Sequence, residues 1–165
     1  MTMHNGNSYA APANAMSAAE PNVAQQAGLM HRGIALDLNA TCRWLGMAVR
    51  IDTNSSVILR AALDLGFKPA PHVEPGIDLH WEFVIESALG GSNGSSSLRV
   101  LRDGQTVFIE MGQQGWFAFD PETGAGAGFL VAAESGEAVE AYFKAVTDVI
   151  EPVARRSIKA AAHRD

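Results

Sequence analysis

The chain has 165 residues, of which 47% are apolar and 18% are charged, and its formal net charge is −6. This much apolar material suffices for the core of one ordinary domain, which excludes a chain that is disordered throughout. An acidic chain without a basic stripe matches nucleic acid poorly, because phosphate contacts need clustered lysine and arginine. No apolar run reaches the roughly 18 residues of a membrane span, so we expect no membrane partner.

The N-terminal segment differs in composition from the rest of the chain. Residues 1–29 are rich in Ala, Asn, Gln, Ser and Pro and show no sustained apolar period, which predicts a disordered tail. The segment lacks the basic start and apolar stretch of a secretory signal. The single cysteine, Cys42, cannot form an internal disulfide. We therefore expect a cytoplasmic protein in which residues 30–165 form one domain.

Two strands and a helix are predicted first along this domain. Apolar residues alternate in "RGIALDLN" (32–39) and in "WLGMAVRID" (44–52), and the two segments can pair as a hairpin across a connection that contains Thr41. "RIDTNSSVILRAALDLGF" (50–67) then passes from a strand through a polar cap into apolar residues at helical spacing. Gly66 is the expected stop of this helix.

Five further strands follow. The alternation of "IDLHWEFVIES" (77–87), with Val84 as its one exception, is the clearest strand pattern in the chain. "LRVLRDGQTVFIEMG" (98–112) predicts a hairpin about Asp103-Gly104, since Asp-Gly is a strong turn signal. "GWFAFD" (115–120) and the glycine-rich "AGAGFLVA" (125–132) complete the set.

The last predicted element is an amphipathic helix from Ser135 to about Lys159, capped by Ser135. Pro152 should kink or break it, because proline removes one hydrogen bond and crowds the preceding turn. This order of elements predicts an α+β fold. We expect a mostly antiparallel sheet of six to seven strands with two helices packed on it.

Sequence motifs for catalysis are missing. The phosphate-loop pattern and the nucleophile elbow of serine hydrolases do not occur, so we lean against an enzyme and expect no cofactor. Asn54, Ser55 and Ser56 precede the first helix, where free backbone N–H groups and the helix dipole favour an anion. The alternative interpretation is that these residues only form a turn and a helix cap.

A metal site is the second candidate. Asp78, His80 and Glu82 share one face of a predicted strand, because the side-chain period of a strand is two. Oxygen and imidazole ligands suit a divalent ion, but other segments would have to complete a compact site. The alternative is an ordinary solvated face opposite a core face that contains Trp81.

Aromatic residues suggest a protein interface. Alternation places Trp116 on one face of its short strand and Phe117 and Phe119 on the other, so that both faces need cover. In the interface interpretation a partner covers one of them, since large exposed apolar patches mark association. The alternative is that the fold's own helix and loops cover both faces. Tyr142 and Phe143 of the C-terminal helix join these three as candidate partner-binding residues.

"GMAVRIDTNSSVILRAALDLGF" (46–67) resembles the N-terminal region of bacterial HPr-kinase-like serine kinases. The hairpin, the aromatic strand and "EAYFKAVTDVIEP" (140–152) are compatible with this resemblance, which extends over residues 33–150. In those kinases such a helix leads into a nucleotide-binding domain, whereas this chain ends where that domain would start. The resemblance therefore implies a non-catalytic front module whose role is binding or assembly.

The sequence thus predicts a non-enzymatic module that associates with a protein partner or with itself. An accessory subunit of a separately encoded enzyme is one form of this hypothesis. The alternative is a small-molecule or metal-binding protein that uses the strand face of Asp78, His80 and Glu82.

Overall fold

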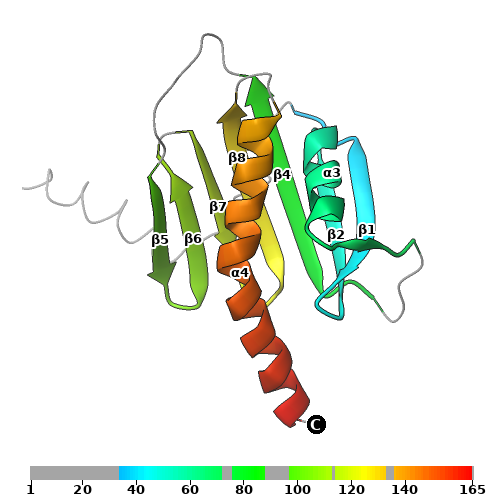
Figure 1. Ribbon diagram of the computed structural model, residues 1–165. Coiled ribbons are helices and arrows are strands. Elements are labelled where there is room, and N and C mark those ends of the chain that lie inside the picture. The colour runs from blue at the N-terminus through cyan, green and yellow to red at the C-terminus, as the bar shows by residue number, and fades with distance from the viewer. Residues whose placement is uncertain (1–33, 72–75, 88–96, 113, 133–135, 165) are drawn as a thin grey trace, which may run out of the picture.

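The computed structural model describes residues 34–71, 76–87, 97–112, 114–132 and 136–164. The predicted disordered tail and the predicted cap Ser135 lie outside these residues. The described residues form an eight-stranded sheet with two helices packed on one face (Figure 1). The strands are β1 (Leu38–Trp44), β2 (Met47–Thr53), β3 (Lys68–Pro69), β4 (Leu79–Ser87), β5 (Leu98–Asp103), β6 (Thr106–Met111), β7 (Gly115–Phe119) and β8 (Ala125–Ala132).

The predicted α+β class is confirmed, with eight strands in place of six or seven. The extra strand is β3, which has two residues and lies at one edge of the sheet. The strand order is β3-β1-β2-β4-β8-β7-β6-β5. The helices are α3 (Ser56–Asp64) and α4 (Glu137–Arg164).

Strand β4 is parallel to both of its neighbours, whereas the other pairs are antiparallel. Its parallel pairing with β2 requires a crossover, and α3 lies in the connection between them. β4 is also parallel to β8, although the antiparallel strands β5, β6 and β7 come between β4 and β8 in the sequence. The central strand is therefore flanked by segments that are distant in sequence.

The core lies between the sheet and the helices and is centred on Trp81, which is fully buried in β4. Edge-on contacts join its indole to five aromatic rings at centroid distances of 5.5 to 6.3 Å, namely those of Trp44, Phe67, Phe83, Phe117 and Phe119. Such edge-to-face contacts are a preferred geometry of aromatic packing. Strands from both halves of the sheet thus meet on one side chain.

Two glycines of β8 let these rings approach the sheet. A Cβ on Gly126 would lie 2.7 Å from Cδ1 of Trp81. A Cβ on Gly128 would fall on the Tyr142 hydroxyl and lie 2.7 Å from Cδ2 of Phe117. The Tyr142 hydroxyl donates a hydrogen bond to the Trp116 carbonyl at 2.7 Å, which ties α4 to β7. The glycines of "AGAGF" therefore have a packing role.

The predicted bounds of the first strand are wrong. The first strand begins at Leu38, not near Ile34, and it continues through Thr41 to Trp44. The tight turn falls instead at Leu45-Gly46, where both residues have positive φ (55° and 82°) and close a two-residue hairpin. Of the two effects predicted for Pro152, a kink or a break, the break does not occur, because α4 continues from Glu137 to Arg164. Val153 and Ala154 beside the proline are buried, which stabilises the helix there.

The close approach at β8 predicts that Gly128→Ala destabilises the protein. The new methyl group must displace the Tyr142 hydroxyl or the Phe117 ring, at a cost of about 1–3 kcal/mol in the free energy of unfolding. Gly76→Ala is the matched control, since its Cβ would meet no atom within 4 Å. Urea denaturation measures both, and equal stability of the two variants would contradict the packing role.

Candidate functional site

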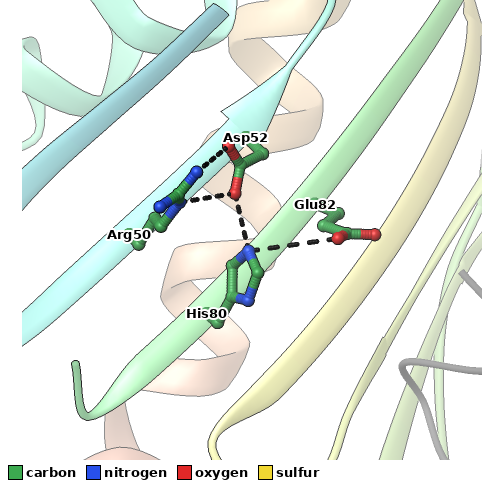
Figure 2. Close-up of polar contacts among 4 residues, drawn as sticks. All are labelled: Arg50, Asp52, His80 and Glu82. Carbon is green, nitrogen blue, oxygen red and sulfur yellow. Dashed lines mark hydrogen bonds and ion pairs between the residues drawn. The ribbon is translucent and has the colours of Figure 1, made fainter. Parts of the chain in front are cut away.

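A polar cluster lies on the helix-free face of the sheet, where β2 and β4 run side by side (Figure 2). Arg50 and Asp52 of β2 alternate with buried Val49 and Ile51, which face the core. His80 and Glu82 alternate in the same way along β4. The parallel register places Arg50 opposite His80 and Asp52 opposite Glu82.

Asp52 is the centre of the cluster. Its carboxylate accepts hydrogen bonds from Nε of Arg50 at 2.9 Å and from a terminal nitrogen of Arg50 at 3.1 Å. Nε2 of His80 lies 2.6 Å from Oδ2 of Asp52 and 3.9 Å from Oε1 of Glu82. The Asp52 side chain is 12% exposed, while those of Arg50 and His80 are each 48% exposed.

Charge and burial shift the pKa of Asp52 in opposite directions. Burial raises the pKa of its carboxyl, but the hydrogen bonds and charges of Arg50 and His80 outweigh burial and hold the pKa below its ordinary value. The hydrogen bond to Asp52 in turn raises the pKa of the Arg50 guanidinium. Asp52 is therefore an ionised anchor that orients two exposed nitrogen-bearing side chains.

This arrangement lacks the partner that a catalytic dyad requires. An aspartate that orients a histidine activates a nucleophile only if a hydroxyl or thiol bonds the imidazole. Within the described residues, His80 has no such partner, and the Cys42 thiol is buried, which raises its pKa. The described residues therefore do not assemble a nucleophilic site around His80.

The predicted metal residues are only partly brought together. His80 and Glu82 are neighbours, but the Asp78 carboxylate accepts a hydrogen bond from the Ala48 backbone N–H at 2.8 Å. Asp52, which was not among the predicted metal residues, is closer to His80 than Glu82 is. In the part of the chain that the structure describes, no three His, Cys, Asp or Glu side chains gather as a metal site. The metal hypothesis thus receives no support.

Of the three residues predicted for an anion at the first helix, Asn54 joins two strands, whereas Ser56 is exposed. The Asn54 side chain donates to the Ile85 carbonyl and accepts from the Ile85 N–H, both at 2.8 Å. Ser55 is the N-cap of α3, but its side chain makes no cap hydrogen bond. Asn54 therefore extends the β2–β4 contact beyond the last strand pair, Thr53 with Phe83.

The predicted partner-binding aromatics are mostly core residues. Four of them are at most 1% exposed, namely Phe117, Phe119, Tyr142 and Phe143. Trp116 is half-buried on the helix-free face beside Phe108. Of the five candidates, only Trp116 is within reach of a partner.

Three exposed large apolar side chains belong to β5, which was predicted only as one arm of a hairpin. All six of its residues are exposed, including Leu98 (48%), Val100 (44%) and Leu101 (40%). Strand β5 is the last strand of the sheet, and Figure 1 shows it at the edge remote from α3. The signal in the sequence is that "LRVLRD" places apolar residues on both faces of one strand.

Comparison with protein-family models, with curated proteins and with solved structures gives no match to this chain. The resemblance to HPr-kinase-like proteins therefore stays a prediction. Within the described ranges, neither helix is long and apolar enough to cross a membrane.

The two hydrogen bonds of Asn54 predict a structural loss on its removal. Asn54→Ala leaves the N–H and carbonyl of Ile85 without partners and should lower the free energy of unfolding by about 2 kcal/mol. Ser55→Ala is the matched control and should change it by less than about 0.5 kcal/mol, since no cap bond is lost. Similar losses in chemical denaturation of both variants would mean that Asn54 acts as an ordinary cap residue.

The charged cluster predicts a pH-dependent contribution to stability. Asp52→Asn should lower the free energy of unfolding at pH 7 by about 1–2 kcal/mol, because charge-assisted bonds to Arg50 and His80 weaken. The folded-state pKa of Asp52 is depressed, so this stabilisation is present above the unfolded-state value, about 3.9, and is lost as the pH falls through the folded-state pKa.

Urea titrations of wild type and Asp52→Asn between pH 7 and pH 2 measure this effect. The difference between them should shrink below about pH 4. Asp148→Asn is the control, because the Asp148 pair with Lys144 is exposed on α4 and should matter little. A difference that stays constant with pH would exclude ionised Asp52 as its source.

Proposed function

We propose that this protein is a non-enzymatic association module and that it binds protein through the free edge of β5. The exposed apolar edge carries the proposal, because such a strand offers unpaired backbone groups and apolar side chains to a further strand. Main-chain hydrogen bonds give this kind of contact its affinity, and the alternating side chains give it specificity.

The two edges of the sheet differ in a way that supports this function. The opposite edge, β3, has two residues, Lys68 and Pro69, and both types are typical of edges that resist pairing. Strand β5 has six residues, no proline and three exposed large apolar side chains. Of the two edges of the described sheet, β5 is therefore the one suited to accept another strand.

The backbone of β5 presents three residues outward. The Gly112 N–H donates to the Ser97 carbonyl, so Ser97 and every second residue after it direct their backbone groups at β6. Leu98, Val100 and Arg102 consequently direct theirs away from the sheet. Within the described residues, no strand pairs with this side of β5.

The helix-free face next to this edge adds a second contact region. Phe108 of β6 and Trp116 of β7 are half-buried there, next to the fully buried Ala118 and Ala127. The polar cluster of Asp52 lies further along the same face, on β2 and β4. An incoming chain that pairs with β5 could extend over this mixed apolar and polar surface.

The resemblance to the front module of HPr-kinase-like proteins agrees with an association role and suggests an accessory subunit of a separately encoded enzyme. The absence of a basic stripe in the sequence supports a protein partner over nucleic acid. Cytoplasmic location is part of the same proposal and rests on the single cysteine, which cannot form an internal disulfide.

Site-specific photo-crosslinking tests the proposal. A photo-reactive phenylalanine analogue replaces Val100 in the full chain, and light is applied in the producing cells. We expect a protein adduct, because Val100 is exposed and its backbone faces the free edge.

The control places the same analogue at Glu122, which is exposed in the turn between β7 and β8. Adducts from Val100 and not from Glu122 support association at β5. No adduct, or equal adducts from both positions, would reject β5 as the binding edge.

A further inference from the structure

We propose that the strand received by β5 is β5 of a second copy of this chain, in an antiparallel pairing whose twofold axis passes beside Leu101. The inference rests on the proposed function, because it names the partner of the same edge. The product would be a symmetric dimer with one continuous sheet, a common route to homodimers.

Symmetry restricts the possible registers. A twofold axis perpendicular to the sheet preserves its two faces, and directly opposed residues of an antiparallel pair share a face. A residue of β5 can therefore lie opposite itself or opposite a residue an even number of positions away. Leu98, Val100 and Arg102 lie on the helix side with Val107 and Ile109, whereas Arg99, Leu101 and Asp103 lie on the other side.

The registers differ in which charged residues of β5 lie opposite one another. An axis at Arg99 or at Arg102 sets two guanidinium groups against each other, which is unfavourable. An axis at Val100 places Arg99 opposite Leu101 and Arg102 opposite Leu98, so neither arginine lies opposite a carboxylate. An axis at Leu101 places Arg99 opposite Asp103 of the second copy, twice by symmetry, and Val100 opposite Arg102. Only the last register places opposite charges against each other.

The backbone agrees with the Leu101 register. Val100 and Arg102 direct their N–H and C=O groups outward, so they form the hydrogen-bonded pairs with the second copy. Leu101 with Leu101, and Arg99 with Asp103, then occupy non-hydrogen-bonded pairs, in which side chains approach more closely. The apolar contact and the ion pairs therefore fall where side-chain contact is best.

The charged groups are available for this contact. Arg99 lies 3.7 Å from Glu110 on β6, so its guanidinium is already held on the helix-free side where Asp103 of the second copy would arrive. Asp103 is exposed and has no ion-pair partner among the described residues. Dimerisation would also cover Leu101, which is 40% exposed in the single chain.

Disulfide trapping tests the register. In a non-hydrogen-bonded pair the two Leu101 Cα atoms would lie about 4.5 Å apart, within the range that a disulfide spans. Leu101→Cys should therefore form a covalent dimer under mild oxidation. Val100→Cys is the matched control and should not, since Val100 faces Arg102. The native Cys42 is buried, which keeps the background low.

Charge exchange tests the same contact without a covalent bond. Arg99→Asp and Asp103→Arg each place like charges opposite one another, and each should weaken the dimer by about tenfold or more in sedimentation velocity. The double variant restores opposite charges and should recover dimerisation. Circular dichroism checks that each variant is folded, because Asp103 also borders the hairpin turn.

The outcomes separate this inference from the proposed function. Trapping at Leu101 with rescue in the double variant supports the dimer. A monomer in sedimentation over the whole concentration range overturns it, as does equal trapping at Val100. If the Val100 crosslink then joins a different protein, association at β5 stands and only the second copy is wrong. A crosslink within one chain, or none, rejects both.

Discussion

The packing of aromatic rings around Trp81 is the constraint on which the rest of the structure depends. This side chain lies in the central strand, and rings from β1, β4, β7 and the segment after α3 all contact it. The rings fit because β8 carries glycine at positions 126 and 128 on the core side. Its helix-free side carries Ala127, also fully buried, so β8 has small residues on both faces where the sheet is most crowded.

The parallel arrangement of β4 has a consequence for the opposite face. Parallel pairing in this register sets Arg50 beside His80, and Asp52 can then accept from both. The same strands hold Ile51 and Trp81 in the core, so the position of the polar cluster follows from core packing. Asn54 follows the end of β2, where the backbone hydrogen bonds between β2 and β4 stop. Its side chain bonds the backbone of Ile85 and so keeps the two strands side by side.

Local signals in the sequence predicted those elements that local chemistry determines. The alternation of 77–87, the Asp103-Gly104 turn and the helix that stops before Gly66 are all present. The start of β1 was wrong because alternation cannot show where pairing begins. Its register depends on a turn in which Leu45, a residue that rarely adopts positive φ, does so. Pro152 does not break α4, because burial of the neighbouring residues outweighs one lost hydrogen bond.

The site was less predictable because it depends on which strands are neighbours. Asp52 and His80 are 28 positions apart, and only the parallel β2–β4 pairing reveals that they meet. Asp78, in contrast, was grouped with His80 by alternation, but it lies before the strand and bonds the Ala48 backbone. Aromatic content was a misleading guide to binding, since Phe117, Phe119, Tyr142 and Phe143 are needed inside.

Because most of these aromatic residues are buried in the core, few are left on the surface to anchor a partner. Most tight interfaces rely on buried aromatic or arginine anchors and cover about 1,200–2,000 Å². A six-residue edge with leucine and valine covers less, so its affinity must come largely from backbone hydrogen bonds. In the proposed dimer, charge would set the register more than the strength of the contact, because Arg99 and Asp103 are exposed. A reversible, concentration-dependent assembly is the form of association that this edge favours.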